Sequence, residues 1–352
     1  MEPEISRSMQ SDRSHRGQAT RRPASSGRRW TESAAYAWAV RVLIVDNPVS
    51  FRGPYPVARI LPILEGAGWE VDVLHRTPGV STRAQVAEAL ERGYDLVVGA
   101  GGDGTLRDLA GALAGRGVPL GVLPGGTANI WAQELGIPGD SEQAALMLLD
   151  GVSRPMDLGR LVLPDRRFSR FMLMAGIGID ALMLALTDPR LKRTLGAGGI
   201  ALGAIHALPV FRPFTARITV DGEPAWEGRA LQIIVGNTRR YAKVVEVTPE
   251  AYADDGLLDA TIVPAGDPGA AMRLAWSFAT HRRPRPGDAP YLRGRAFLLE
   301  TDAVPPMELD GGHLDAASIR RAGKGPYRIT ADPDALRAWV PRSYRGQLFS
   351  RG

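Results

Sequence analysis

Short apolar runs alternate with amphipathic stretches through the first half of the chain. Four runs have the length and β-branched content of buried strands, at Val40–Val45, Trp69–Leu74, Leu96–Ala100 and Leu120–Leu123. Three stretches between them repeat apolar residues at helical spacing, at Val57–Leu64, Thr82–Arg92 and Leu106–Leu113. Because strands that alternate with helices favour a parallel sheet, we predict a doubly wound α/β domain over residues 39–155.

The pattern changes near residue 155, where apolar and polar positions begin to alternate. Six such runs follow, at Phe168–Met174, Ala216–Val220, Ala230–Val235, Leu258–Val263, Ala296–Thr301 and Tyr327–Thr330. Asp-Gly pairs between them are typical of tight turns. We therefore predict a mainly antiparallel β-sandwich over residues 156–345, whose last segment can return to the first domain. Helical pieces are expected near Ala181–Val210 and Gly269–Thr280.

The first 38 residues are rich in Ser and Arg and are predicted to form a disordered basic tail. Residues 1–30 hold seven Arg and three acidic residues, which leaves 36 basic and 35 acidic residues for the rest. A body so close to neutrality is a poor electrostatic match for nucleic acid, which we exclude as a partner. The tail is either a solvated extension, which we favour, or a segment attracted to an anionic membrane.

Cysteine is absent from the chain, and the five histidines are scattered. Disulfides and thiolate metal sites are therefore excluded, and a cytoplasmic location is the simplest interpretation. No apolar stretch reaches the length of about 18 residues that a membrane-spanning helix needs. We expect a protein without a transmembrane segment.

A glycine-rich turn at Gly101–Thr105 ends the third predicted strand and precedes a helix. Glycine lets the backbone approach an anion closely, and the first amides of a helix carry partial positive charge. The turn therefore favours a phosphate, although an ordinary strand-to-helix connection has the same pattern. Asp103 would repel a bare phosphate, so it fits a metal-bridged phosphate, a hydroxyl or neighbouring backbone amides. This combination suggests phosphoryl transfer.

A second glycine turn, Pro124–Asn129, closes the next predicted strand. Because the carboxyl ends of parallel strands meet at one edge of a sheet, the two turns should lie side by side. Asn47, which follows the first strand, falls at the same edge. Glycine, hydroxyl and amide groups gathered there favour a site for a polyanion over two unrelated turns.

Carboxylates gather at a turn in the second half of the chain, where Asp254, Asp255 and Asp259 lie close in sequence. Carboxylate and carbonyl oxygens suit Mg²⁺ or Ca²⁺. A solvated turn whose aspartates cap nearby amides explains the pattern equally well. A further acidic turn holds Asp310, followed by His313, and such turns are most often structural.

The order of these motifs resembles the diacylglycerol kinase catalytic family, which includes bacterial lipid kinases, sphingosine kinases and ceramide kinases. The resemblance covers about residues 40–341, with segments at Asn47–Ser50, Gly101–Thr105, Gly126–Pro138, Asp157–Gly159, Gly176–Ala181, Asp255–Asp259 and Leu309–Gly311. It implies that ATP is the phosphoryl donor and that a lipid hydroxyl is the acceptor.

The resemblance also implies roles for particular residues. The nucleotide would be lined by Asn47, Pro48, Ser50, Thr77, Gly101, Gly102, Asp103, Gly104, Thr105, Gly126, Thr127 and Asn129. A Mg²⁺ ion would be bound by the Asp255 carboxylate, with backbone oxygens of Tyr252 and Leu257. Such a site suits phosphoryl transfer, which relies on positioning and charge neutralisation.

The proton acceptor is where this chain departs from the family pattern. The family has Asp-Gly-Glu where this chain has Asp310-Gly311-Gly312, and the glutamate is the expected base. Three explanations stay open: Asp310 or Asp103 acts as the base, His313 substitutes from the next position, or catalysis is lost. Because loosely dissociative transfer needs little from a base, we favour an active kinase over an inactive relative.

A lipid substrate needs a route to the site. The apolar stretch Ala271–Phe278, followed by the basic stretch His281–Arg285, is either an interfacial anchor or, as we favour, a core helix with a basic end. Residues 182–214 either line a lipid pocket or belong to the core. We predict a kinase of a diacylglycerol-like lipid, peripheral to the inner face of the membrane, and a homodimer stays open. The alternatives are a kinase of a sphingoid or other long-chain alcohol and a non-catalytic nucleotide- or lipid-binding relative.

Overall fold

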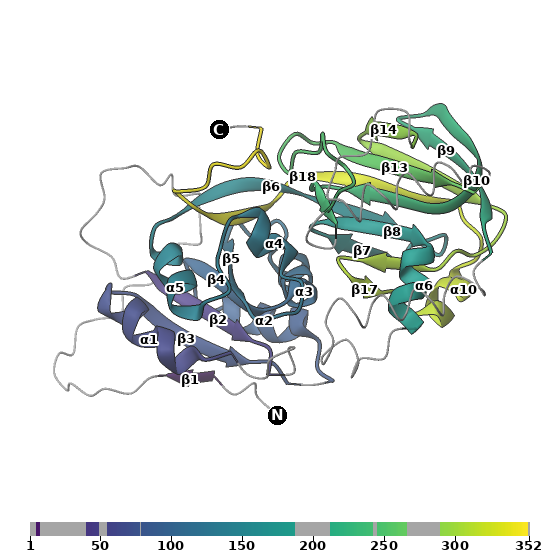
Figure 1. The fold of residues 1–352 in the computed structure, drawn as a ribbon. Helices are drawn as coiled ribbons and strands as arrows, with labels where there is room; N and C mark the ends of the chain where they lie inside the picture. Colours follow the sequence, from purple (N-terminus) through teal and green to yellow (C-terminus); the bar gives the residue numbers. More distant parts are fainter. Residues whose placement is uncertain are drawn as a thin grey trace.

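The computed structural model describes residues 5–7, 40–48, 55–77, 79–186, 212–241, 245–265 and 289–350. Two domains lie side by side, an α/β domain followed by a β-rich domain (Figure 1). Ser50, the predicted helix Gly269–Thr280 and most of the segment Ala181–Val210 fall outside the described residues. None of the helices in the described ranges is long and apolar enough to cross a bilayer.

Four parallel strands form the sheet of the first domain. In spatial order they are β3 (Glu70–His75), β2 (Arg41–Asp46), β4 (Leu96–Gly101) and β5 (Pro119–Pro124). The helices of this domain are α1 (Val57–Gly66), α2 (Thr82–Leu90), α3 (Asp103–Leu113), α4 (Ile130–Glu134) and α5 (Ser141–Leu149). The chain passes from β2 to β3 in one direction and from β3 to β4 in the other, so right-handed crossovers place α1 and α2 on opposite faces. The predicted doubly wound sheet is confirmed.

A short strand, β1 (Ile5–Arg7), pairs antiparallel with β3, and Ile5 lies opposite Leu74. This strand falls within residues 1–38, the segment expected to be a disordered tail. An edge strand such as β3 offers unpaired backbone groups, to which an extended segment can bind. The expectation of disorder is therefore wrong for residues 5–7.

Antiparallel strands build the second domain, as predicted. They are β6 (Gly151–Val162), β7 (Phe168–Phe171), β8 (Met174–Gly178), β9 (Phe214–Val220), β10 (Glu223–Gly236), β13 (Leu258–Pro264), β14 (Tyr291–Gly294), β15 (Ala296–Thr301), β16 (Met307–Leu309), β17 (Gly312–His313) and β18 (Tyr327–Pro341). The strands β11 (Arg240–Tyr241) and β12 (Val245–Glu246) form a separate pair. In the part of this domain that the structure describes, the helices are α6 (Ile179–Leu186) and α10 (Ala316–Ala322).

The last strand, β18, joins the sheets of the two domains. It pairs antiparallel with β15 and β6 in the second domain and parallel with β5 in the first, where Arg337 lies opposite Pro119. The sequence predicts only its first four residues, because Asp332-Pro333-Asp334 interrupts the alternation and produces a register shift between Asp332 and Leu336. The strand therefore leaves the second domain and ends in the first. The predicted domain limits at residues 38, 155 and 345 stay a prediction.

The single strand predicted at Phe168–Met174 is wrong, because the structure divides it. The strand β7 ends at Phe171 and β8 begins at Met174. The backbone amides of Met172, Leu173 and Met174 donate hydrogen bonds to the Asp310 carboxylate at 2.8, 2.8 and 3.0 Å. The Asp310 carboxylate, 136 to 138 residues away in sequence, thus interrupts the strand that the local alternation of apolar and polar residues predicted.

Asp157 on β6 connects the irregular part of β18 to the acidic turn. Its carboxylate accepts hydrogen bonds from the amides of Asp334 at 2.9 Å and Gly256 at 2.6 Å. Burial raises the pKa of Asp157, while these two hydrogen bonds act in the opposite direction. The side chain therefore fixes two turns that have no regular backbone pairing of their own.

We predict that Asp157→Ala lowers the free energy of unfolding by about 2–3 kcal/mol, since two backbone donors lose their acceptor. Chemical denaturation measures the change. The matched control is Asp150→Ala, whose side chain is 67% exposed, and it should cost about 0.5 kcal/mol or less. Equal effects of the two substitutions would contradict the role assigned to Asp157.

Candidate functional site

The two predicted glycine turns lie against each other, backbone to backbone. Pairing of β4 with β5 sets Gly101 opposite Pro124, and the Gly125 amide donates to the Gly101 carbonyl at 2.9 Å. A Cβ on Gly126 would overlap the Cα of Gly102, and a Cβ on Gly102 would lie only 3.0 Å from the Cα of Gly126. Residues without a side chain are therefore required on both turns.

The first turn of α3 faces open space beside this contact. A Cβ on Gly104 would have no neighbour within 4 Å among the described residues. Asn47, which follows β2, donates from Nδ2 to Thr105 Oγ1 at 2.9 Å. Three strand ends thus meet at one edge of the sheet, where helix amides and glycine backbone can approach a phosphate.

Asn129 and Asp103 hold the second turn in place. The Asn129 side chain accepts from the Gly126 amide at 2.7 Å and donates to the Gly126 carbonyl at 2.9 Å. Its φ of +51° is the left-handed conformation that asparagine tolerates. Asp103 Oδ1 accepts from the Trp131 amide, the second residue of α4, at 3.1 Å. The sequence analysis considered a metal-bridged phosphate, a hydroxyl and backbone amides as partners of Asp103, and the structure shows a backbone amide.

The remaining predicted nucleotide residues differ in position. Pro48 directly follows Asn47, and Thr127 is half-buried within the second turn. Thr77 is exposed after β3, with its amide bonded to Gln85 Oε1 at 3.1 Å. All three therefore follow strands at the carboxyl edge of the sheet, the edge that holds the glycine turns.

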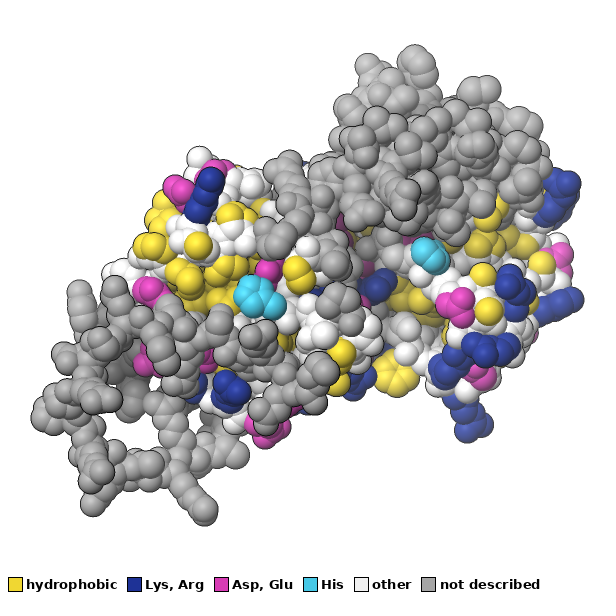
Figure 2. All heavy atoms as spheres, turned by 90° about the horizontal axis from the view of Figure 1, so that it is seen from below, with side chains coloured by type: hydrophobic (Ala, Val, Ile, Leu, Met, Phe, Trp, Pro, Cys, Tyr) yellow, Lys and Arg dark blue, Asp and Glu magenta, His cyan; other side chains and the backbone are white. Residues whose placement is uncertain are grey.

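A cleft of about 380 Å³ runs between α2 and α3 of the first domain and β7 and β16 of the second. Its lining includes Arg76, Arg83, Arg107 and Arg170. Figure 2 shows Lys and Arg side chains at the boundary between the domains. Arg107 on α3 spans this boundary, because its Nη1 donates to the Leu309 carbonyl at 2.7 Å. The cleft therefore offers positive charge one helical turn from the glycine-rich turn.

Gly312 leaves room for that arginine. A Cβ at position 312 would lie 2.6 Å from Arg107 Nη1. The space where the expected glutamate side chain would begin is thus taken by a guanidinium group. The contact of Arg107 across the domains was not visible in the sequence, because the Leu309 carbonyl lies 202 residues away.

The proposed catalytic residues near Gly312 differ in their surroundings. Asp310 is buried, and its carboxylate already accepts the three amide hydrogen bonds of Met172 to Met174. Burial raises the pKa of Asp310 to about 6, although these bonds and the charge of Arg107 act against the increase. His313 is exposed on β17. The geometry gives Asp310 an evident structural role, whereas the base remains unassigned among the predicted residues.

Two acidic residues near this turn were given no role by the sequence analysis, although Asp180 lies in the segment Gly176–Ala181 that it names. Glu308 and Asp180 are both buried, and Glu308 lies on β16, opposite Gly176 of β8. The signal for Glu308 was an acidic side chain between the apolar residues Met307 and Leu309. For Asp180 it was the interruption of an apolar run.

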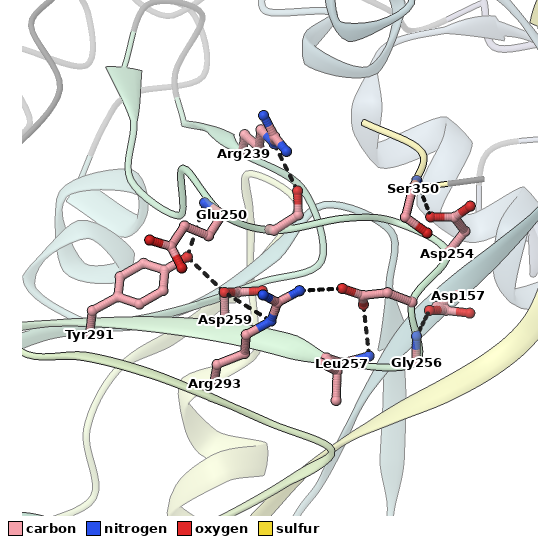
Figure 3. Close-up of polar contacts among 12 residues, drawn as sticks. Asp157, Arg239, Glu250, Asp254, Gly256, Leu257, Asp259, Tyr291, Arg293 and Ser350 are labelled. Carbon is pink, nitrogen blue, oxygen red and sulfur yellow. Dashed lines mark hydrogen bonds and ion pairs between the residues drawn. The ribbon is translucent and has the colours of Figure 1, made fainter. Parts of the chain in front are cut away.

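An arginine neutralises the acidic turn that was expected to bind Mg²⁺. Asp255 Oδ2 pairs with Arg293, and Asp255 Oδ1 accepts from the Leu257 amide at 2.9 Å. Asp259 pairs with the same arginine at 3.7 Å and accepts from the Tyr291 hydroxyl at 2.7 Å. Figure 3 shows Arg293 pointing to Asp259 and to the turn at Gly256 and Leu257.

The Asp255 carboxylate, the side-chain ligand of the metal site that the sequence suggested, is already engaged by protein groups. Both of its oxygens have a partner, the Leu257 amide and the Arg293 guanidinium. Within the described residues, no three His, Cys, Asp or Glu side chains are grouped so that they could hold a metal ion. Mg²⁺ bound by Asp255, Tyr252 and Leu257 therefore stays a prediction that the Arg293 ion pairs oppose.

We predict that Arg293→Met lowers the free energy of unfolding by about 2 kcal/mol, a value between those of surface and buried ion pairs. Millimolar Mg²⁺ should raise the melting temperature of this variant and leave that of the nucleotide-free wild type unchanged. Thermal unfolding with and without Mg²⁺ measures both effects. Arg217→Met, which breaks an exposed pair with Glu227, is the control. Stabilisation of the wild type by Mg²⁺ that Arg293→Met abolishes would contradict this interpretation.

We predict that Gly126→Ala destabilises the protein by about 1–3 kcal/mol, because the new methyl group overlaps the Gly102 backbone. ATP affinity should fall about tenfold or more, since the two turns must separate. Gly139→Ala is the control, because its Cβ would meet nothing within 4 Å among the described residues. Calorimetric titration with ATP reports the difference, and unchanged affinity in Gly126→Ala would refute the assignment of the turns.

Comparisons with known proteins agree with both domains. A profile of the diacylglycerol kinase catalytic domain matches residues 41–161, and a profile of the YegS C-terminal NAD kinase beta sandwich-like domain matches residues 174–340. A protein from Pseudomonas aeruginosa named probable lipid kinase YegS-like is 34% identical over 280 residues, which cover 78% of this chain and 86% of that protein. A protein of the same name from Pseudomonas syringae pv. tomato is 37% identical over 284 residues, covering 78% and 85%.

A solved structure has the same overall fold. It is that of a protein from Bacillus anthracis put forward as a diacylglycerol kinase, with a TM-score of 0.72 at 22% sequence identity. The match covers 90% of this chain and 100% of that one. At this level of identity the likeness bears on the fold alone.

Proposed function

This chain belongs to the diacylglycerol kinase catalytic family and is a kinase, and we propose that it transfers the γ-phosphoryl group of ATP to the hydroxyl of a diacylglycerol-like lipid. The observation that carries the proposal is the contact between the two glycine turns beside the open first turn of α3. Helix amides and side-chain-free backbone at one sheet edge suit the phosphates of a nucleotide.

The donor end of the reaction depends on positioning. Asn47, Gly101–Thr105 and Gly126–Asn129 would hold the phosphates, and Arg107 would lie next to the transferred group. Phosphoryl transfer spreads charge over the oxygens of the transferred group, so a fixed guanidinium lowers the barrier. Mg²⁺ bound by ATP itself would neutralise the phosphates.

The acceptor end lies in the second domain, across the cleft from the nucleotide. The carbonyl of Leu309, the neighbour of Asp310, is the atom to which Arg107 binds, so the two domains meet where acceptor and donor would meet. The lipid chain would come from the inner face of the membrane. The protein would then work at a membrane surface during turnover.

We predict that the purified protein, given radiolabelled ATP and Mg²⁺, labels diacylglycerol in mixed micelles. Parallel micelles with a sphingoid base and with a long-chain alcohol test the other acceptors. Label on the sphingoid base or the alcohol alone would replace the diacylglycerol assignment, and ATP binding without label on any lipid would contradict a lipid acceptor.

We predict that Asp103→Asn lowers kcat/KM for ATP about tenfold or more, because the charge-assisted hydrogen bond from the Trp131 amide, which holds the second glycine turn in place, is weakened. The steady-state rate at varied ATP concentration measures the change. Asp150→Asn, which alters an exposed aspartate far from the turn in sequence, should behave as the wild type. Intact ATP binding and turnover in Asp103→Asn would show that the nucleotide lies elsewhere.

A further inference from the structure

Two buried carboxylates face each other above Gly176 in the second domain. Glu308 on β16 lies opposite Gly176 in the β16–β8 pairing, and Asp180 follows on the first turn of α6. A Cβ on Gly176 would overlap Asp180 Oδ2 and would lie 2.7 Å from Glu308 Oε1. The glycine therefore leaves the space into which both side chains point.

The outer oxygens of this pair are engaged, while one inner oxygen has no partner. Glu308 Oε2 accepts from the Gly311 amide at 2.7 Å, and Asp180 Oδ1 accepts from the Ala181 amide at 2.6 Å. Glu308 is 1% exposed, and its Oε1 has no hydrogen-bond partner within the described part of the chain. A buried acceptor without a donor is costly, and either a proton shared with Asp180 or the hydroxyl of a ligand would satisfy it.

Two carboxylates so close in a buried site share a proton instead of carrying two charges. Burial and the neighbouring Asp180 raise the pKa of Glu308 well above its usual range, and Asp310 adds to the effect. The charge of Arg107 acts in the opposite direction. With one proton shared, the pair carries one negative charge and can take up one more proton.

Arg107 connects this pair to the nucleotide turn. Its guanidinium donates to the carbonyl of Leu309, the residue after Glu308, and lies against Gly312. The helix that carries Arg107 begins at the glycine turn. The carboxylate pair thus lies on the acceptor side of the arginine, and the phosphate turn lies on the donor side.

We propose that Glu308, paired with Asp180, receives the acceptor hydroxyl and takes its proton, the role that the family pattern gives to a glutamate at position 312. The inference rests on the proposed function. The hydroxyl oxygen forms a bond to the γ-phosphorus, the bond from that phosphorus to the bridging oxygen breaks, and ADP leaves. The hydroxyl proton passes to the Glu308–Asp180 pair, which becomes neutral and then releases one proton to solvent.

The test is Glu308→Gln, which keeps the shape of the side chain but cannot take a proton. We expect kcat to fall about 100-fold or more, with the ATP dissociation constant within about twofold of the wild type. Glu300→Gln, an exposed glutamate on the nearby strand β15, should change neither value. The kcat of the wild type should fall as the pH is lowered, because the pair is then fully protonated, and Glu308→Gln should not show this fall. A purely structural defect at position 308 would lower kcat without removing this pH dependence.

Two results would overturn the inference: wild-type kcat in Glu308→Gln, or a fall of kcat at low pH that is unchanged in Glu308→Gln. If Glu308→Gln fails to fold, Asp180→Asn tests the other member of the pair. An unchanged kcat in Asp180→Asn would also overturn the inference. A wild type that labels no lipid contradicts the proposed function and this inference together. Labelled lipid with an unaffected Glu308→Gln contradicts this inference alone.

Discussion

The contact between the backbones of Gly102 and Gly126 is the constraint on which the candidate site depends. Two parallel strands deliver the turns to one edge of the sheet, but only residues without a Cβ allow them to touch. Once they touch, Asn129 can close the second turn on itself and Asp103 can accept a hydrogen bond from the Trp131 amide of α4. Asn129 and Asp103 therefore stabilise the close contact of the two turns, which the glycines make possible.

A second constraint is the joint between the domains. The strand β18 pairs with β15, β6 and β5, so the two sheets cannot move apart without breaking backbone hydrogen bonds. Arg107 adds a bond across the cleft to the Leu309 carbonyl. Because Gly312 carries no side chain, this arginine lies where the family pattern would place a glutamate side chain. A guanidinium thus occupies the place of the expected carboxylate at position 312, and it cannot accept a proton. The proton acceptor therefore has to be sought elsewhere in the chain.

The features that the sequence predicts well are those encoded locally. An apolar run followed by glycine marks the end of β4 or β5. Because the carboxyl ends of parallel strands meet at one edge of a sheet, Asn47 is then expected beside both turns. The helix α5 was missed although Asp140 caps it and Ala144 and Leu148 are buried at helical spacing.

Contacts between distant segments could not be predicted in this way. Arg107 and Leu309 are 202 residues apart, and the partners of Asp310 interrupt a strand that the local pattern made continuous. Arg293 beside the acidic turn and Glu308 above Gly176 follow from strand register, which a single sequence does not reveal. The ion pairs of Arg293 with Asp255 and Asp259 are the clearest case, because a neighbouring strand brings a guanidinium beside carboxylates that the sequence analysis considered only as metal ligands or amide caps.

The central claim is that the two contacting glycine turns bind the phosphates of ATP. Hydrogen–deuterium exchange with and without ATP and Mg²⁺ tests it directly, since every backbone amide of both turns is a separate probe. The account predicts slower exchange on nucleotide addition at residues 101–107 and 125–129. Slower exchange confined to the acidic turn at residues 252–259, with both glycine turns unchanged, would contradict it.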